Sequence, residues 1–253
     1  MADFLAGKTA LVTGAGGTLG ASHARAMAAH GAHVVIHDIR PDAAGEVADS
    51  LQGAGGEAST LICDITDEAA LRKGVDHMAE SVGGFDILVN NAGITGNNAL
   101  LEDIDEDFFD RMFDIHVKGT FFATRAVLPH IKRRGGGRIV NTISGRAFSG
   151  AVSGSHYNGA KGAILGLTRA WASEFAPHGV TVNAVAPGLT PSGMTRARLG
   201  EEGLARRAGD LISNRLPTAE EISSGVLYFL TGEAAIVTGR VLNMQQPRKA
   251  EII

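Results

Sequence analysis

The chain has 253 residues and a formal net charge of −4, and its acidic and basic residues are interspersed. This length is ordinary for one α/β domain, and no basic block indicates a nucleic-acid partner. Hydrophobic residues make up 44% of the chain and charged residues 20%, which is typical of a globular protein and not of a disordered one.

The N-terminal residues lack a basic segment followed by a long apolar run, so no signal peptide is predicted. No apolar run approaches the roughly 20 residues that cross a bilayer, so no membrane association is expected. The only cysteine, Cys63, excludes an intrachain disulfide and favours a cytoplasmic setting.

Short runs rich in β-branched apolar residues recur along the chain, and such runs suit strands that are buried on both faces. They span residues 9–14, 33–38, 58–64, 86–93, 138–144, 180–188 and 240–244. Segments long enough for helices lie between most of them, at residues 19–30, 67–82, 108–134, 156–176 and 218–231. This alternation predicts one doubly wound, Rossmann-type α/β domain over residues 1–253, with a mostly parallel seven-stranded sheet between two helix layers.

In such a sheet, ligands bind beyond the carboxyl ends of the strands. The first strand is followed by the glycine-rich loop TGAGGTLG (residues 13–20), which opens the first helix. Glycines there let backbone N–H groups approach a pyrophosphate at a helix N-terminus, although glycines also serve simple tight turns.

The second strand ends in Asp38, 18 positions after Gly20, close to the roughly 20 expected for a carboxylate that binds an adenosine ribose. A carboxylate there repels a 2′-phosphate, and the loop itself has no Arg or Lys, although Arg40 is near. The sequence therefore favours NAD over NADP. The alternative is that Asp38 is an ordinary solvated acid at a strand end.

The motifs TGAGGTLG, CDITD, NNAG, IVNTIS, YNGAK and NAVAPG, in this order and spacing, resemble those of the short-chain dehydrogenase/reductase family. The resemblance covers nearly the whole chain and is that of the ordinary ~250-residue type. It implies an NAD site with contacts from these residues: Gly14, Gly16, Gly17, Thr18, Leu19, Gly20, Asp38, Ile39, Asp64, Ile65, Asn91, Ala92, Gly93, Tyr157, Lys161, Pro187, Gly188, Thr190 and Ser192.

Tyr157 and Lys161 are four residues apart, so on a helix they share one face. Such pairs are common on solvated helices, but the resemblance assigns Tyr157 as catalytic acid/base, Lys161 as its partner and Ser144 as the orienting hydroxyl. A lysine charge about 5 Å from the phenol, at an effective dielectric of about 20, is worth roughly 3 kcal/mol. We therefore expect the pKa of Tyr157 to fall by about two units, to near 8.

Three positions depart from the family's usual residues. Thr18 replaces the middle glycine of the loop, where its hydroxyl would cap the helix or bond a phosphate. His116 replaces an asparagine whose backbone carbonyl serves a proton relay through the lysine. It is either a participant that titrates or a buried histidine without chemical role. Ser192 replaces a threonine that bonds the carboxamide, and it keeps the hydroxyl.

The end of the chain also departs from the pattern. The family usually closes its last strand with an Asp-Gly-Gly turn, and here residues 244–253 (MQQPRKAEII) replace it. Pro247 is expected to stop the strand. The tail then reaches a neighbouring subunit, covers the active site or frays, and the sequence does not choose between these.

On the substrate side, residues 189–213 are expected to form a mobile lid. Its arginines would meet an acidic substrate, but the neighbouring acids favour a solvated amphipathic helix instead. The expected substrate contacts are Ile94, Ser144, Ala147, Phe148, Leu189 and Met194. Because most of these are apolar, a hydrophobic secondary alcohol or ketone is the leading substrate class.

The sequence thus predicts an NAD-dependent oxidoreductase that interconverts a secondary alcohol and its ketone, without a metal. Two alternatives stay open: a hydroxyacyl-thioester dehydrogenase, for which His116 and the lid arginines are a weak pointer, and a catalytically silent nucleotide-binding scaffold. The resemblance further implies a homotetramer, with an interface from residues 108–134 and 156–176.

Overall fold

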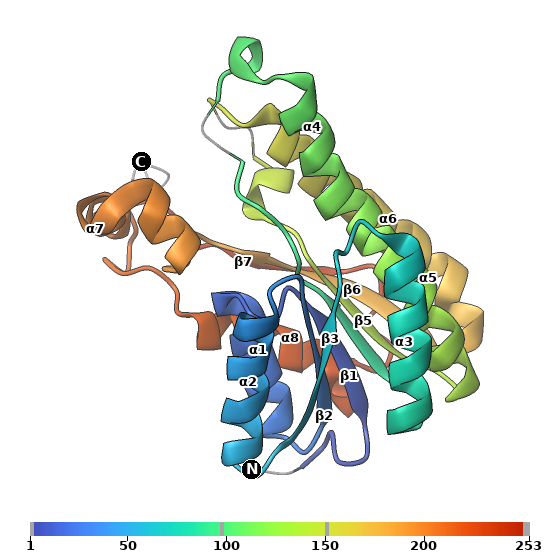
Figure 1. Ribbon diagram of the computed structural model, residues 1–253. Coiled ribbons are helices and arrows are strands. Elements are labelled where there is room, and N and C mark those ends of the chain that lie inside the picture. Colours follow the sequence, from blue (N-terminus) through green and yellow to red (C-terminus); the bar gives the residue numbers. More distant parts are fainter. Residues whose placement is uncertain (1–2, 97–98, 150–151, 250–253) are drawn as a thin grey trace.

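The structure is a computed structural model, and it describes residues 3–96, 99–149 and 152–249. Seven parallel strands form the centre of the molecule (Figure 1). The strands are β1 (Thr9–Thr13), β2 (His33–Asp38), β3 (Glu57–Ile62), β4 (Ile87–Asn90), β5 (Gly137–Thr142), β6 (Val180–Pro187) and β7 (Val241–Met244). Their order across the sheet is β3-β2-β1-β4-β5-β6-β7, and each neighbouring pair is parallel. The predicted strands and the doubly wound α/β fold are confirmed.

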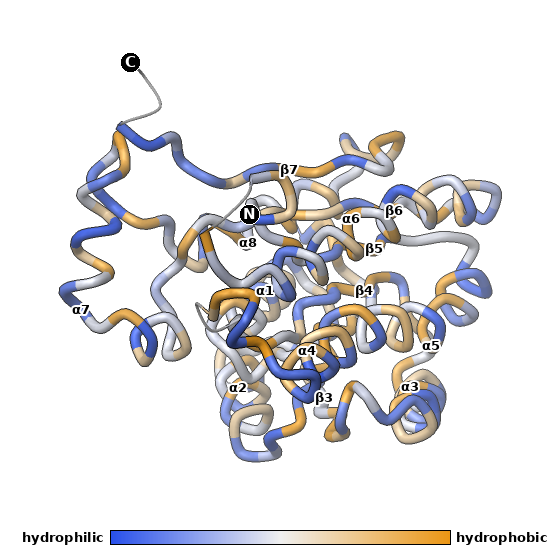
Figure 2. The backbone as a smooth tube through the Cα atoms, turned by 90° about the horizontal axis from the view of Figure 1, so that it is seen from above, coloured by the Kyte–Doolittle hydropathy of each residue, from blue (hydrophilic) through white to orange (hydrophobic). Residues whose placement is uncertain are grey.

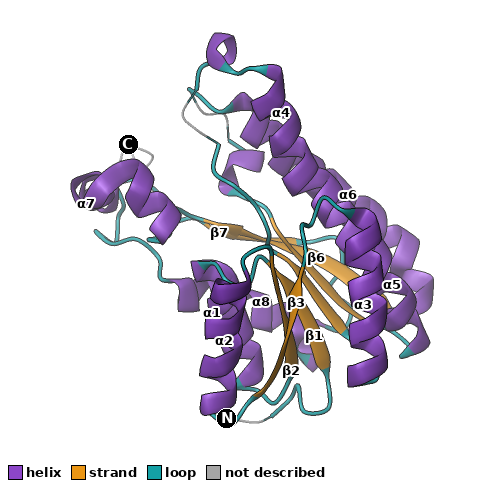
Figure 3. Cartoon of the chain, in the orientation of Figure 1, coloured by secondary structure: helices purple, strands orange, loops and turns teal. Residues whose placement is uncertain are grey.

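Helices cover both faces of the sheet (Figure 3). They are α1 (Thr18–Ala28), α2 (Pro41–Gly53), α3 (Glu68–Val82), α4 (Glu106–Phe113), α5 (Gly119–Arg133), α6 (Ser155–Phe175), α7 (Gly193–Gly209) and α8 (Ala219–Leu230). Alternate residues of β1 serve the two layers: Val12 packs in the cluster that includes α1 and α8, and Leu11 in the cluster that includes α3, α5 and α6. Burial on both faces explains why the strands are continuous apolar runs.

The predicted helix over residues 108–134 is interrupted, which corrects the sequence-based expectation. A π-helical turn, Asp114–Lys118, separates α4 from α5. It contains His116, whose Nε2 lies 3.1 Å from the Ile94 amide nitrogen and 2.9 Å from its carbonyl oxygen. The wider turn lets His116 reach the chain that leaves β4, and helix periodicity does not reveal such a turn.

The strand order reverses between β1 and β4, which are neighbours although two strands lie between them in the chain. Loops that leave such adjacent strands in opposite directions open a crevice at the carboxyl edge of the sheet. Helices long and apolar enough to span a bilayer are absent from the described parts of the chain.

Candidate active site

A continuous cavity of about 2190 Å³ lies at the carboxyl ends of the strands. All the predicted cofactor contacts line it, from the loop after β1 to the start of α7. Ser144 and His116 line it as well. The structure therefore brings together groups that are up to 178 positions apart, from Gly14 to Ser192, at one edge of the sheet.

The glycine-rich loop is shaped for the close approach of an anion. Gly14 has φ +63°, a conformation that favours glycine. A Cβ on Gly20 would lie 2.4 Å from the Gly14 carbonyl oxygen, and one on Gly16 would lie 2.9 Å from Asp38 Oδ2. The first N–H groups of α1 have no partner within the helix and carry its positive partial charge. The residues present therefore fit a pyrophosphate.

Thr18 is the first residue of α1 and is exposed on the cavity wall. The N-cap of the helix is Gly17, with no side-chain hydrogen bond. Thr18 therefore does not cap the helix, which excludes one of its two predicted roles. Its exposure also shows that the side chain does not crowd the loop backbone.

Asp38 is not a solvated strand-end acid. Its side chain is 6% exposed; Oδ2 accepts from the Gly16 N–H at 3.0 Å, and Oδ1 from Arg40 Nε at 3.1 Å. Burial acts to raise the pKa of Asp38, but hydrogen bonds and charge from Arg40, with the Gly16 N–H, outweigh burial and lower this pKa. The carboxylate is thus ionised at neutral pH, and it forms an ion pair with the Arg40 guanidinium.

Asparagines of the NNAG segment tie the central strands together beside the cavity. Asn91 donates from its side chain to the carbonyls of Thr13 and Gly14, at 3.0 and 3.2 Å. Asn90 Nδ2 donates to Asn141 Oδ1 at 2.9 Å, across to β5. These bonds join β4 and the residue after it to both neighbouring strands, β1 and β5.

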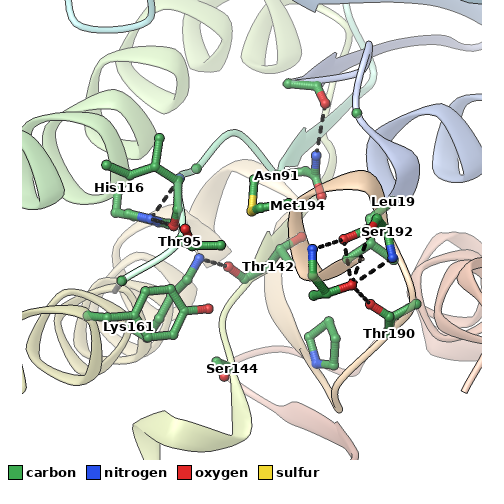
Figure 4. A pocket seen from close by; sticks show the side chains of 18 of the residues that line it. Leu19, Asn91, Thr95, His116, Thr142, Ser144, Lys161, Thr190, Ser192 and Met194 are labelled. Carbon is green, nitrogen blue, oxygen red and sulfur yellow. Dashed lines mark hydrogen bonds between the residues drawn. The ribbon is translucent and has the colours of Figure 1, made fainter. Parts of the chain in front are cut away.

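Tyr157 and Lys161 belong to α6 and line the cavity, as does Ser144, two residues after β5. Figure 4 shows Lys161 bonded to Thr142, the last residue of β5. Lys161 is 3% exposed, and its Nζ donates to the Thr142 carbonyl at 2.8 Å. The same Nζ lies 5.8 Å from the centroid of the Tyr157 ring. Because Lys161 is buried and its Nζ is bonded to the end of β5, it does not belong to a solvated helix face, and that alternative is excluded.

The prediction that the pKa of Tyr157 falls is wrong for the protein without a bound cofactor. Burial raises this pKa above its ordinary value, and the smaller opposing effects come from hydrogen bonding to Ser144 and from the charges of Arg146 and Arg198. Burial also lowers the pKa of Lys161 to about 7. Spacing alone could not reveal this, because desolvation acts on both groups and weakens the lysine charge that the prediction relied on.

His116 is 2% exposed, and its ring meets the Tyr157 ring edge-on at 5.6 Å between centroids. Burial, with a smaller effect from the Lys161 charge, lowers the pKa of His116 to about 3. The imidazole is therefore neutral near pH 7, which contradicts a role that depends on titration there. Gly93 makes room for it, because a Cβ on Gly93 would lie 2.3 Å from His116 Cε1.

The substrate end of the cavity agrees in part with the sequence. Ile94, Leu189 and Met194 line it as expected. Ala147 and Phe148 are not among its lining residues: Ala147 packs against the core cluster around Ile143, and Phe148 is 50% exposed. The 3₁₀ turn Gly145–Ala147 causes this difference, because it directs side chains away from the line that an extended strand would follow.

Sequence reasoning missed Arg146, which lines the cavity two residues after Ser144. The sequence also favoured a solvated helix for the arginines of the lid segment, yet Arg198 and Arg207 line the cavity. Arg196 pairs with Glu201, so one of the predicted acid–base offsets is present. Ser192 caps α7 in a capping box with Thr195, so its hydroxyl has a structural partner.

The described part of the tail, up to Lys249, returns to the lid segment and lines the cavity, as the alternative of a tail that covers the active site expects. After β7 the chain runs back to the end of α7 (Figure 2). The Pro247 carbonyl accepts from the Ile212 N–H at 3.2 Å, and Lys249 Nζ donates to the Gly209 carbonyl and to Asn214 Oδ1, each at 2.7 Å. Gln245 lines the cavity and fills the space beside Gly145.

Known proteins are similar to this chain in both sequence and fold. A family model described as short chain dehydrogenase matches residues 8–203. An uncharacterized oxidoreductase of Thermotoga maritima is 36% identical over 94% of this chain and 96% of its own. The 3-oxoacyl-acyl-carrier-protein reductase FabG of the same organism is 31% identical over 95% of this chain and 97% of its own.

Among solved structures, a 7α-hydroxysteroid dehydrogenase in complex with NADH and 7-oxo glycochenodeoxycholic acid superposes with a TM-score of 0.90. It is 31% identical, over 96% of this chain and 95% of that one. With the glycine-rich loop, Ser144, Tyr157 and Lys161 at one cavity, these matches have one reading: the chain belongs to the short-chain dehydrogenase family of oxidoreductases.

Proposed function

We propose that this oxidoreductase uses NAD(H) to interconvert a secondary alcohol and its ketone. The observation that carries the proposal is the buried Lys161 beside Tyr157 and Ser144, in the cavity that also contains the glycine-rich loop. Cofactor and substrate thus have one continuous space, with a phenol and a hydroxyl at the junction. The NADH in the related 7α-hydroxysteroid dehydrogenase supports NAD as the cofactor, and Asp38 supports it over NADP.

In the reducing direction, Tyr157 passes its phenolic proton to the substrate oxygen. Its raised pKa keeps the phenol protonated at neutral pH, which suits an acid. Ser144 donates to the same substrate oxygen and orients it, and a charged Lys161 stabilises the phenolate that remains. A bound nicotinamide supplies the hydride in this direction and accepts it in the reverse.

Replacing Tyr157 by Phe tests the proposal, because it removes the proton and keeps the ring. We expect kcat for ketone reduction with NADH to fall about 10²- to 10⁴-fold, while NADH binding, followed by nicotinamide fluorescence, persists. The other tyrosine, Tyr228, is exposed on α8, so Tyr228→Phe is the matched control and should retain activity. Turnover retained by Tyr157→Phe would remove Tyr157 from its role.

The second candidate, a hydroxyacyl-thioester dehydrogenase, draws support from the similarity to the acyl-carrier-protein reductase and from the arginines at the cavity. Comparing a hydroxyacyl-CoA with its free alcohol analogue separates the two, and the absence of an advantage for the thioester dismisses this candidate. A silent nucleotide-binding scaffold is disfavoured because Ser144, Tyr157 and Lys161 are all present and line one cavity. The homotetramer and the cytoplasmic location are further proposals, which light scattering and cell fractionation test.

A further inference from the structure

Six arginines line the cavity that contains the candidate acid/base Tyr157, and three of them are Arg146, Arg198 and Arg207. Arg146 belongs to the 3₁₀ turn directly after Ser144, and Arg198 and Arg207 belong to α7. They thus approach the cavity from two separate elements, one that follows the sheet and one in the lid segment. The three arginines therefore do not simply form the charged face of one helix.

None of these guanidinium groups forms an ion pair within the described residues, 3–96, 99–149 and 152–249. Arg146 makes one side-chain hydrogen bond there, from Nη1 to the Ser153 carbonyl at 3.4 Å. Asp210 lines the same cavity but pairs with none of them. By contrast, Arg196 on the same helix pairs with Glu201.

The charges act on one another and on Tyr157. Desolvation, with the charges of Arg146 and Arg207, lowers the pKa of Arg198. The positive charges of Arg146 and Arg198 also act to lower the pKa of Tyr157, because they stabilise its phenolate. Like charges held together without an ion-pair partner raise the local positive potential, which a ligand with the opposite charge would relieve.

We propose that the alcohol or ketone carries an oxyanion, a carboxylate or a phosphate ester, close to its reacting carbon, and that Arg146 and Arg198 bind this oxyanion. The inference rests on the proposed function and specifies its substrate class. Guanidinium groups suit the task because their planar donors match the oxygens of a carboxylate or phosphate. Ile94, Leu189 and Met194 then contact the apolar body of the substrate.

The place of the charges distinguishes this proposal from recognition of coenzyme A. The phosphates of that carrier are separated from its thioester by the long pantetheine arm, so they lie far from the carbon that reacts. Arg146 lies two residues after Ser144, to whose Oγ its backbone N–H donates at 3.2 Å, so it belongs to the reacting end of the cavity, which Arg198 also lines. A compact hydroxy acid or phosphate therefore suits them better than a carrier thioester.

The test compares matched ketones in NADH-dependent reduction. The pairs are 4-oxopentanoate, 5-oxohexanoate and 4-oxo-4-phenylbutanoate, each with its methyl ester, and dihydroxyacetone phosphate with dihydroxyacetone. We expect kcat/KM for at least one anion to exceed that of its neutral partner by about tenfold or more, because hydrogen bonds to charged groups are the strong ones. The pair that responds identifies a carboxylate or a phosphate as the source.

Arg146→Gln and Arg198→Gln should each lower the anion-to-neutral ratio of kcat/KM about ten- to a hundredfold. The matched control is Arg206→Gln, since Arg206 is an exposed arginine of the same α7 that is not among the lining residues. If the arginines only tuned Tyr157, both members of a pair would lose activity equally and the pH–rate profile would shift. That outcome overturns the proposal.

Failure of the inference and failure of the proposed function give different results. Turnover of the ketones that depends on Tyr157 but lacks any anion preference overturns the inference and leaves the proposed function standing. If no ketone is reduced although NADH binds, calorimetry titrates the same pairs into the NADH complex. Tighter binding of an anion, lost in Arg146→Gln, supports the inference, and equal or absent binding overturns it.

Discussion

At the scale of single residues, Asp38 contacts Arg40, and we propose that this contact sets the preference for NAD over NADP. The carboxylate holds the Arg40 side chain through Nε, at 3.1 Å, and through Nη2, at 3.4 Å. Both residues line the cavity, so a group that repels a 2′-phosphate and a group that attracts one stand side by side. While Asp38 is ionised, it both repels the phosphate and occupies the arginine.

Replacing Asp38 by Ala should therefore move the preference from NADH toward NADPH. The change removes the repelling charge and frees Arg40, and we expect the ratio of the two dissociation constants to change about ten- to a hundredfold. Nicotinamide fluorescence titration measures both constants without a substrate. Asp42→Ala, at an exposed acid on the first turn of α2, is the control and should leave the ratio as it is in the wild type. An unchanged ratio in Asp38→Ala would show that Asp38 does not select the cofactor.

At the scale of secondary structure, two helices line the cavity from different sides. Helix α6 presents Tyr157 and Lys161 on one face, and α7 with the residues after it forms the opposite wall (Figure 1). The tail contacts α7 and its following turn through backbone and side-chain hydrogen bonds, with an antiparallel bridge between Leu211 and Arg248. The position of this wall thus depends on a segment that follows the last strand.

Lys249→Ala removes two of these hydrogen bonds, to the Gly209 carbonyl and to Asn214 Oδ1. At about 1 kcal/mol each, their combined loss should raise KM for the substrate by up to about thirtyfold. Hydrogen exchange at residues 209–214 should become faster by a similar factor. Lys73→Ala, at an exposed site on α3, serves as the control. Exchange as slow as in the wild type would mean that the tail does not hold this segment.

At the scale of the whole molecule, several buried histidines make stability depend on pH. Burial lowers the pKa of His23 and His37 to about 4 and that of His116 to about 3, from the ordinary 6.5. Between those values and 6.5 the unfolded chain binds more protons than the folded one. The free energy of unfolding must therefore fall as the pH drops below about 6.5. Lys161 acts in the same direction at higher pH, because its pKa is about 7 against the ordinary 10.5.

We expect unfolding by urea to show a loss of about 2 kcal/mol for each of these histidines between pH 7 and pH 5. His116→Asn should reduce this pH-dependent loss by about 2 kcal/mol, whatever its effect on stability at pH 7. His77→Asn, at an exposed site on α3, should leave the loss unchanged. The same pH dependence in His116→Asn and in the wild type would contradict the assignment of a buried, neutral imidazole.

Local patterns in the sequence predicted the parallel sheet, the glycine-rich loop and the face shared by Tyr157 and Lys161. They succeed because strand burial, turn geometry and helical spacing depend on residues near one another in the chain. Likewise, Asp38 could be recognised from its distance to the loop. The candidate site was therefore largely predictable wherever its residues belong to short motifs.

Only the tertiary structure decided what lies around these motifs. The convergence of Arg146 and Arg198, the turn that removes Ala147 and Phe148 from the cavity, and the return of the tail depend on contacts between distant segments. The raised pKa of Tyr157 depends on burial, which four-residue spacing does not contain. Charge and desolvation act through space and not along the chain, so these features appear only when the chain is folded.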